Sequence, residues 1–268
     1  MLSTRAAMLR PVVLAQPMLM GQRRLLSAVP SVPSGATLRL FGYQICPFCH
    51  TVKSVARSAG VPLAFTEVNP LTKSEIGFSK DHRKVPIAVM DDGSVVVESE
   101  TIIEELLRRS PPGDASFASE DAKRWAKWAA SDLAVMMYPN ITRNYEECKL
   151  ALSYASTAFS PLQAFLVKYV GAFGMSMAHG KIKQKYGIED ERESLMERLA
   201  AWETELQGRD FRGGDAPDLG DVAVFGVLGA VAGLPAREDV VRRRPAVGAW
   251  LDRVDAALPP AVLVGDDE

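Results

Sequence analysis

The chain has 268 residues, of which 47% are hydrophobic and 24% are charged, a composition typical of a globular protein. Its three cysteines are too few for a disulfide framework, so the fold must rest on a hydrophobic core and the thiols are free for chemistry. Residues 1–66 carry seven basic and no acidic side chains, whereas the remainder carries 24 basic against 33 acidic. A body with this excess of acid is not expected to bind nucleic acid, because neutralising phosphates needs a basic face.

The first 34 residues differ in composition from the rest of the chain. They contain four arginines, four serines, several prolines and no acidic residue. Organelle transit peptides share this Arg- and Ser-rich, acid-poor composition. The longest apolar run falls short of the roughly 18 residues that a membrane anchor needs. We therefore predict that residues 1–34 are a transit peptide or a disordered leader and that the location is mitochondrial, with peripheral association with a membrane left open.

Residues 35–110 show the alternating strands and helices expected of a small α/β domain. Short β-prone runs predict strands, and Pro47 and Gly60 suit the start and the stop of a helix. The predicted order is a strand at 37–43, a helix at 46–60, a strand at 61–70, a short helix or turn at 71–84, a hairpin at 85–97 and a helix at 98–110 capped by Ser99. This β-α-β-α-β-β-α order is the layout of the thioredoxin and glutaredoxin fold.

The second half of the chain is predicted to be all-helical. Its first helix has an apolar face at helical spacing and is expected to end at residues 138–140, which include Pro139. Asp218 and Asp221 have the spacing of a capping box before a nearly apolar run, which should form the centre of this domain. The predicted divisions are a polar linker at 111–120, an all-helical domain at 121–260 and an acidic tail at 261–268.

One helical stretch, residues 151–178, has two interpretations. It contains no acidic residue and one lysine, and the basic run KIKQKY follows it, so one interpretation is a helix that lies on or in a membrane. However, serines, Pro161 and Lys168 interrupt it. Its longest uninterrupted apolar part, about ten residues, is more typical of a helix buried in a protein core. We expect the buried helix.

The stretch CPFCH, residues 46–50, allows three kinds of chemistry. C-x-x-C-H is the attachment signature of a c-type haem, in which the histidine ligates the iron. Two cysteines at this spacing also supply half of a zinc site, but the other cysteine and histidines form no second close pair. The third kind is thiol–disulfide chemistry, for which a strand before the motif and a helix after it are the expected surroundings. We favour the third, because the strands around the motif do not match a small helical haem domain.

In the thiol interpretation the two cysteines have different roles. Cys46 would lie at the N-terminus of a helix, where unpaired backbone N–H groups and the helix dipole favour a thiolate. Cys49, one turn further on, would be less exposed and would resolve a mixed disulfide by attacking Cys46. Tyr43, three residues before Cys46, either donates its hydroxyl to a sulfur or a substrate oxygen, or has a packing role.

Two further motifs of the same domain would complete a site for a glutathione-like ligand. Val85-Pro86 opens a strand, where a cis proline would face the cysteines and the backbone of Val85 would pair with a peptide-like ligand. Glu98 and Ser99 open a helix, and they suit an ammonium and a carboxylate group. Both groups occur at the γ-glutamyl end of glutathione. The plain alternatives are a trans proline at a strand entry and an N-cap serine.

A series of separate motifs also runs through both halves of the chain. In the α/β half they are 43–49 (YQICPFC), 67–70 (EVNP) and 83–87 (RKVPI). In the helical half they are Arg124-Trp125 with Trp128, 138–141 with Arg143, Lys168-Tyr169 with Gly171-Ala172, and Asp218-Leu219 before 221–224. In this order they resemble the membrane-associated prostaglandin E synthase type 2 family, over about residues 37–258. Several motifs in sequence make this resemblance far more specific than C-x-x-C alone.

The resemblance implies a glutaredoxin-like domain followed by a glutathione-transferase-like helical domain, usually in a homodimer. It implies isomerisation of prostaglandin H2, a lipid endoperoxide, to prostaglandin E2, with glutathione as cofactor and an association with haem. Carried onto this sequence, Cys46 is the catalytic thiol beside the Tyr43 hydroxyl, and Val85, Glu98 and Ser99 match glutathione-binding positions. The N-terminus departs from the family, because it looks like a presequence and not an anchor helix.

Three functions are compatible with the sequence. The first is the prostaglandin isomerase. The second is a glutathione-dependent thiol–disulfide oxidoreductase or transferase, which would use the same pair, Cys46 and Cys49. The third is a non-catalytic protein that binds haem or glutathione, which the retained Cys49 makes less favoured, because binding alone needs no resolving thiol.

Overall fold

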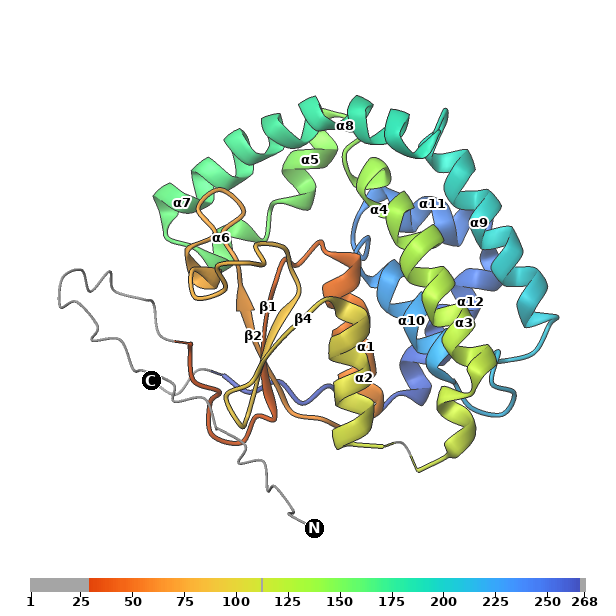
Figure 1. Cartoon of the computed structure of the whole chain (residues 1–268). Helices are drawn as coiled ribbons and strands as arrows, with labels where there is room; N and C mark the ends of the chain where they lie inside the picture. Colours follow the sequence, from red (N-terminus) through yellow and green to blue (C-terminus); the bar gives the residue numbers. More distant parts are fainter. Residues whose placement is uncertain (1–28, 112, 266–268) are drawn as a thin grey trace, which may run out of the picture.

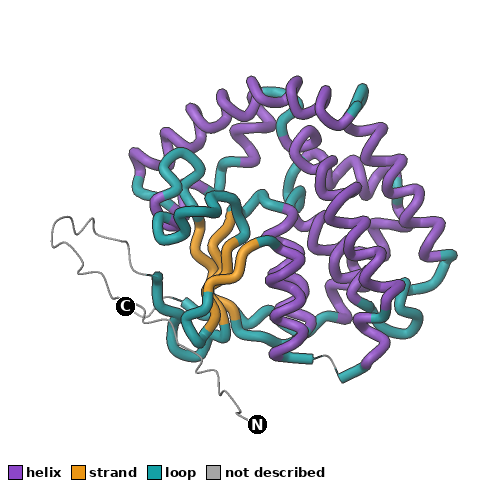
Figure 2. Tube along the Cα trace, in the orientation of Figure 1, coloured by secondary structure: helices purple, strands orange, loops and turns teal. Residues whose placement is uncertain are grey.

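The structure is a computed structural model that describes residues 29–111 and 113–265. The predicted leader up to residue 28 and residues 266–268 of the predicted acidic tail lie outside these ranges. A small sheet with its helices forms one side of the molecule, and a larger group of helices forms the other (Figure 1, Figure 2). The predicted fold class, a thioredoxin-like α/β domain followed by a helical domain, is confirmed.

Four strands form a mixed sheet in the order β2-β1-β3-β4. Their bounds are Leu38–Gly42 for β1, Leu63–Glu67 for β2, Ile87–Met90 for β3 and Val95–Val97 for β4. β1 and β2 run parallel, and β3 pairs antiparallel with β1 and with β4. The segment 71–84 contains a single 3₁₀ turn, η1 (Ser74–Ile76), so this connection is a turn and not a full helix.

Two helices, α1 (Pro47–Ser58) and α2 (Ser99–Arg109), cover one face of this sheet. Because successive side chains of a strand point to opposite faces, Leu38 and Leu40 of β1 lie on the same face. They belong to one buried cluster with Val52 of α1 and Ile102 of α2. This packing fixes α1, and with it the C-x-x-C motif, relative to the sheet.

The helical half surrounds two fully buried tryptophans, Trp202 and Trp250, whose ring centroids lie 5.1 Å apart. Its helical segments are η2 (Ala115–Ala118), α3 (Glu120–Trp128), η3 (Ala129–Leu133), α4 (Ala134–Ile141), α5 (Tyr145–Ala151), α6 (Ala155–Ala158), α7 (Pro161–Leu166), η4 (Val167–Gly171), α8 (Ala172–Tyr186), α9 (Glu191–Leu206), α10 (Leu219–Gly229), α11 (Pro235–Arg243) and α12 (Pro245–Ala257). The segments η3 and η4 are π-helical.

The helix predicted to end at residues 138–140 ends at Ile141, with Pro139 inside its last turn. A proline inside a helix removes one backbone hydrogen bond. The neighbouring Asn140 is buried, and its side chain donates to the carbonyl oxygens of Met136 at 2.8 Å and Glu191 at 2.7 Å. These hydrogen bonds, one of them to a distant helix, help to keep the turn helical.

α10 is the centre of the helical half, as predicted. Asp218 and Asp221 form a capping box at its N-terminus, and the Trp250 indole N–H donates to Asp221 at 3.0 Å. α10 also packs against α1 of the other half. At Gly226 the contact is so close that a β-carbon would lie 2.6 Å from the Cα of Thr51. Both the sheet and α10 therefore hold α1 in place.

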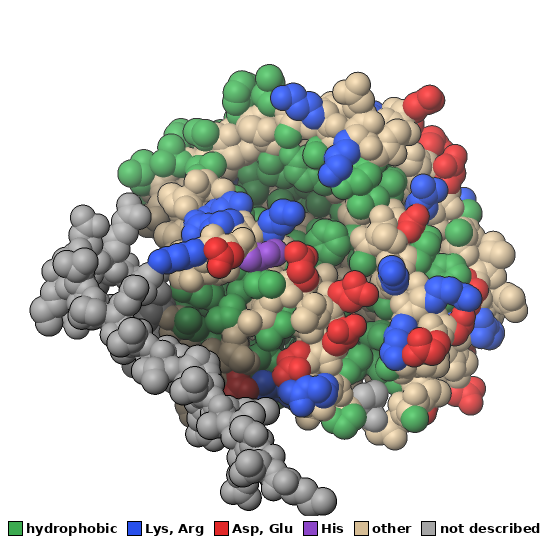
Figure 3. Space-filling view, in the orientation of Figure 1, with side chains coloured by type: hydrophobic (Ala, Val, Ile, Leu, Met, Phe, Trp, Pro, Cys, Tyr) green, Lys and Arg blue, Asp and Glu red, His purple; other side chains and the backbone are tan. Residues whose placement is uncertain are grey.

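The expectation that residues 151–178 form a buried helix is wrong. Side chains such as Val167 and Ala172 are buried, but the other side of the same helical run is uncovered. Its exposed apolar residues recur every three to four positions and are Leu162, Phe165, Leu166, Tyr169, Val170, Phe173 and Met177. We call them the α7–α8 stripe; hydrophobic side chains are visible along this edge of the molecule (Figure 3). Among the described residues, no helix combines the length and apolarity needed to cross a membrane.

The end of the described chain returns to the sheet. The Leu63 N–H of β2 donates to the Val262 carbonyl at 2.9 Å, and the Val264 N–H donates to the Leu63 carbonyl at 3.0 Å. Arg57 of α1 pairs with Asp255 of α12 and donates to a carbonyl a few residues later. We call residues 255–264 the C-terminal strap, because they tie the last helix to the α/β half.

Candidate active site at the start of α1

The first turn of α1 contains the two motif cysteines. Cys46 is the N-cap residue, with an extended backbone (φ −88°, ψ 116°), and Pro47 is the first helical residue. The backbone N–H of Cys49 donates to Cys46 Sγ at 3.4 Å. Cys46 is 8% exposed, whereas Cys49 is fully buried. Cys46 is therefore the sulfur that a ligand can reach, and Cys49 lies behind it.

The two thiols differ in acidity. The pKa of Cys46 is lowered, chiefly because the Cys49 thiol donates a hydrogen bond to it. Burial opposes this effect, while the N–H groups of Cys49 and Phe48 and the charge of Lys53 act in the same direction. Burial raises the pKa of Cys49 well above its ordinary value. Cys46 is therefore the more acidic of the two thiols and the one that ionises first, as a thiol nucleophile requires.

A glycine beneath the cysteines makes this packing possible. Gly42 is the last residue of β1, and a β-carbon there would lie 2.6 Å from Cys49 Sγ and 3.1 Å from the Phe65 ring. Any larger residue would overlap the Cys49 side chain, so the position of Cys49 behind Cys46 depends on this glycine.

The ends of β1, β3 and β4 bring the predicted ligand-binding residues together. Continuing the antiparallel registers past the paired residues puts Pro86 next to Gly42 and Glu98, and Val85 next to Tyr43. Tyr43 and Val85 pack on the same hydrophobic cluster. The peptide bond between Val85 and Pro86 is cis. These residues therefore lie at the edge of the sheet from which the cysteine loop starts.

The start of α2 differs from the prediction. Glu98, and not Ser99, is the N-cap residue, because the chain turns at Glu98 with a φ of 67° and helical geometry begins at Ser99. A positive φ is uncommon for a residue other than glycine and is found most often at functional positions. The Glu98 side chain makes no capping hydrogen bond, and one of its oxygens lies 3.7 Å from His82 Nδ1. Its carboxylate is largely exposed and can meet a ligand.

Tyr43 remains protonated at neutral pH. Burial is the main cause, and with the nearby sulfurs of Cys46 and Cys49 and the carboxylate of Glu67 it raises the pKa of Tyr43 to about 12. Its carbonyl oxygen accepts the N–H of Cys46 at 3.0 Å, so the cysteine loop is a tight turn. The Tyr43 hydroxyl is therefore a hydrogen-bond donor beside the two sulfurs.

Two residues of this site are not evident from the sequence. Glu67, the last residue of β2, accepts a hydrogen bond from the Gln44 backbone N–H at 3.1 Å. Tyr154 lowers the pKa of the same carboxylate, and Glu67 in turn raises the pKa of Tyr154. Burial raises the pKa of Glu67 to about 7, against the hydrogen bond from Gln44 and the attraction of Lys53. The position of Glu67 at the end of a predicted strand could have indicated that it lies near the cysteine loop. Nothing in the sequence relates Tyr154 to this site.

The C-x-x-C-H motif does not fit the attachment of a c-type haem. The Nε2 atom of His50 lies 2.7 Å from the Gln44 carbonyl oxygen, and burial lowers the pKa of His50 to about 4. A c-type haem also needs both sulfurs for its covalent bonds, and Cys49 is fully buried. His50 acts here as a hydrogen-bonding residue of the cysteine loop.

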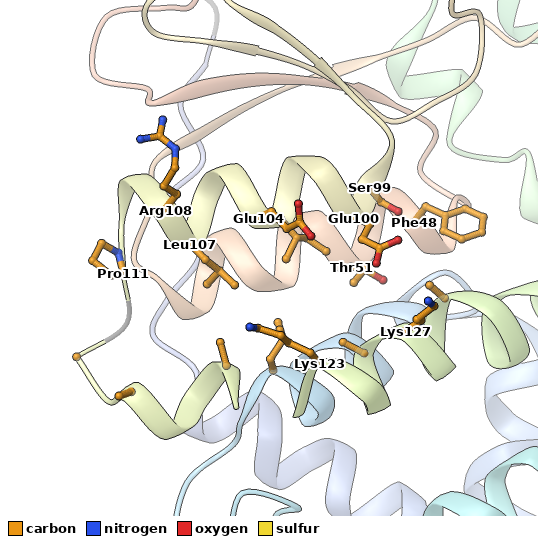
Figure 4. Close-up of a pocket in the computed structure, with 17 residues that line it drawn as sticks. Phe48, Thr51, Ser99, Glu100, Glu104, Leu107, Arg108, Pro111, Lys123 and Lys127 are labelled. Carbon is orange, nitrogen blue, oxygen red and sulfur yellow. The ribbon is translucent and has the colours of Figure 1, made fainter. Parts of the chain in front are cut away.

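A cavity of about 720 Å³ opens between α2 and α3. Phe48 of the C-x-x-C motif and Ser99 lie at one end, Leu107 lies further along α2, and Lys123 and Lys127 of α3 line the opposite wall (Figure 4). Small-molecule sites are commonly about 300–1,000 Å³ in volume. The cavity therefore has the size of a ligand site and adjoins the cysteine motif.

Comparison with known families identifies the two halves. The family model described as the N-terminal domain of glutathione S-transferase matches residues 40–114, and the model of the C-terminal domain matches residues 185–253. Two segments of the chain thus match the two domains of glutathione S-transferases. Residues 115–184, between the two matched segments, include the helical segments from α3 to α7, the exposed stripe and most of α8.

Two curated relatives share most of the chain. Prostaglandin E synthase 2 from Mus musculus is 28% identical over 277 residues, which covers 85% of this chain and 72% of that protein. Prostaglandin E synthase 2 from Danio rerio is 27% identical, covering 82% of this chain and 71% of that protein. The resemblance to the prostaglandin E synthase type 2 family is confirmed.

A solved structure supports the fold. The glutathione S-transferase from Methylobacterium radiotolerans JCM 2831, in complex with glutathione sulfonate, has a TM-score of 0.54 and 17% sequence identity to this chain. The similarity covers 86% of this chain and 99% of that one. At 17% identity this similarity shows a shared fold and nothing about function.

Proposed function

We propose that this chain is a glutathione-dependent enzyme in which Cys46 is the reactive thiol. The observation that carries the proposal is the position of Cys46 as the N-cap residue of α1, where the backbone N–H of Cys49 donates to its sulfur at 3.4 Å. Such a thiol ionises more readily than a free cysteine and is a nucleophile. Two cysteines with a purely structural role would both stay protonated.

Glutathione fits the groups around this thiol. The Glu98 carboxylate suits its ammonium group, and Ser99 with the first-turn N–H groups of α2 suits its α-carboxylate. The backbone of Val85 beside the cis peptide bond suits its extended peptide. When bound, glutathione supplies a second thiol. The glutathione S-transferase solved with glutathione sulfonate supports this assignment through the shared fold.

The reaction we assign is the isomerisation of prostaglandin H2 to prostaglandin E2, supported by the two relatives named Prostaglandin E synthase 2. The Cys46 thiolate attacks one endoperoxide oxygen, the O–O bond breaks, and the second oxygen leaves as an alkoxide that takes up a proton. The carbon bearing the first oxygen then loses a proton, its C–H electrons form the ketone, and the S–O bond breaks to release the thiolate. The Tyr43 hydroxyl donates a hydrogen bond to the oxygen bonded to sulfur. No external oxidant or reductant is consumed.

One observation favours a second candidate, a glutathione-dependent thiol–disulfide oxidoreductase. Cys49 already donates to Cys46, and its protonated thiol is in place to resolve a mixed disulfide on Cys46. The isomerisation needs only one protein thiol. The role of Cys49 therefore separates the two candidates.

We further propose that the α7–α8 stripe lies against a lipid surface, from which an apolar substrate would be supplied. Residues 148–188 contain no acidic residue, and their five lysines are Lys149, Lys168, Lys181, Lys183 and Lys185. Exposed apolar side chains flanked by lysines suit a surface that contains anionic lipids. We also propose that the protein is a homodimer and that it is located in mitochondria. The mass of the protein in solution tests the first proposal, and the cellular location of the tagged full chain tests the second.

A paired assay tests the enzymatic proposal. Purified protein is given prostaglandin H2 and, separately, a mixed disulfide of glutathione. Cys46→Ser should lose both activities. Cys49→Ser should retain isomerisation if the first candidate is correct. The control is Cys148→Ser, which changes a buried cysteine outside the motif and should retain activity. If Cys46→Ser retains both activities, the proposed function is wrong.

A further inference from the structure

Charged side chains line the cavity between α2 and α3 on both sides. α2 contributes Glu100, Glu104 and Arg108, and α3 contributes Lys123 and Lys127 (Figure 4). Most of the remaining lining is apolar. Because α2 belongs to the α/β half and α3 to the helical half, a ligand in this cavity would contact both halves of the molecule at once.

Lys127 differs from the other two cations of this cavity, because it has no acidic partner. Lys123 pairs with Glu120 at 2.7 Å, and Arg108 pairs with Glu105 at 2.6 Å. Among the residues that the structure describes, none forms an ion pair with the Lys127 ammonium group. Its positive charge is therefore available to an anionic group of a ligand.

Lys127 lies at the end of the cavity that adjoins the cysteine motif. In Figure 4 it is at the same end as Phe48 of the motif and Ser99 at the start of α2, on the opposite wall. Lys123 lies one helical turn further from the motif, across from Glu104. Of the two lysines of α3, Lys127 is thus the one on the side of the predicted glutathione site.

The start of α2 offers a carboxylate no positively charged side chain. The first N–H groups of the helix attract an anion at Ser99, but Glu98 and Glu100 on either side of this serine repel it. Glutathione has two carboxylates and one ammonium group, so it needs cations as well as an acid from its site. Lys127 can supply the missing charge from across the cavity.

We propose that Lys127 binds the α-carboxylate of the γ-glutamyl group of glutathione, which lies between Ser99 and Lys127 at this end of the cavity. The proposal rests on the glutathione-dependent function given above. In this arrangement Glu98 meets the ammonium group, Val85 pairs with the peptide and the thiol lies toward Cys46. Lys127 then favours γ-glutamyl compounds over peptides without this carboxylate, and the bound ligand links α2 to α3.

Calorimetry of the full chain with S-methylglutathione tests this contact. The methyl group blocks the thiol, so the ligand cannot form a disulfide with Cys46. Lys127→Met keeps the length of the side chain and removes its charge. This variant should bind the ligand about fivefold more weakly, as expected for the loss of one ion pair that is open to solvent. Lys127→Arg keeps the charge and should bind within about twofold of the wild type.

Two analogues of the ligand identify the group that Lys127 binds. A γ-aminobutyryl group in place of the γ-glutamyl group removes the α-carboxylate and keeps the ammonium group. Lys127→Met should bind this analogue as well as the wild type does, which also shows that the variant is folded. A glutaryl group in the same place removes the ammonium group and keeps the carboxylate, and with this analogue the roughly fivefold difference should return.

The matched control is Lys123→Met, which removes a charge from the same wall and should change the affinity by less than about twofold. Unchanged binding of S-methylglutathione by Lys127→Met would overturn the contact alone. So would an equal loss with the γ-aminobutyryl analogue, or an equal loss in Lys123→Met, because the cavity would then attract anions without a specific partner. Wild-type protein that binds no S-methylglutathione would overturn the proposed function together with the role of Lys127.

Discussion

Replacing Gly226 by alanine should destabilise the whole molecule and disturb the reactive thiol. A β-carbon at this position would lie 2.6 Å from the Cα and 3.0 Å from the backbone nitrogen of Thr51. A backbone atom cannot avoid the overlap by changing rotamer, as the end of a side chain can. The helices α10 and α1 must therefore move apart by roughly 1 Å to restore van der Waals contact. Because Cys46 is the N-cap of α1, a shift of this helix also displaces the thiol.

The loss of stability in Gly226→Ala can be estimated from this steric overlap. Overpacking of a core contact costs about 1–3 kcal/mol. A loss of about 2 kcal/mol corresponds to a fall of roughly 4–8 °C in Tm for a chain of this size. The matched control is Gly180→Ala on α8, where a β-carbon would meet nothing within 4 Å. That variant should gain about 0.5–1 kcal/mol, because alanine is the better helix former.

Thermal unfolding, monitored by circular dichroism, measures the Tm of both variants. The rate at which iodoacetamide alkylates Cys46 in the same samples measures the reactivity of the thiol. The two glycine variants should shift Tm in opposite directions, and only Gly226→Ala should change the alkylation rate. If Gly226→Ala unfolds at or above the wild-type Tm, the argument that α1 and α10 are in rigid backbone contact is refuted.

Three other substitutions have expected outcomes. Cys49→Ala removes the thiol that lowers the pKa of Cys46, so this pKa should rise, and an unchanged alkylation midpoint would mean that another group holds the thiolate. Phe173→Glu should weaken sedimentation with phosphatidylserine vesicles about tenfold, whereas Val241→Glu, an exposed valine on α11, should not; equal losses would argue against the α7–α8 stripe as the lipid-facing surface. Glu98→Gln should weaken glutathione binding up to about fivefold in calorimetry, because its exposed carboxylate loses one ion pair, and unchanged affinity would place the ammonium group elsewhere.

Much of the α/β half could be predicted because the deciding residues lie close together in the chain. The order of strands and helices followed from local periodicity, and Pro47 marked the start of α1. Gly60 adopts a φ of 63° just past the end of that helix, a conformation that favours glycine. The position of Cys46 at a helix N-terminus follows from the same local signals.

The remaining features depend on tertiary contacts that local patterns do not contain. Tyr154 meets Glu67 only because the helical half folds over the edge of the sheet, and the pKa of Glu67 is set by its burial there. The helix around Pro139 continues with the help of hydrogen bonds from Asn140, one of them to α9. The run 161–178 carries apolar residues on every side, and such a pattern does not show which side a neighbouring helix will cover.

The C-terminal strap has a consequence for how a ligand reaches the thiol. The chain joins the two halves once between α2 and α3 and again where residues 262–264 pair with β2 (Figure 1). Two attachments at separate places, together with the close contact at Gly226, leave no single hinge about which the halves could swing apart. Substrate entry must then depend on small movements of side chains and loops around Cys46, so its rate should respond to changes in those loops more than to changes in the linker.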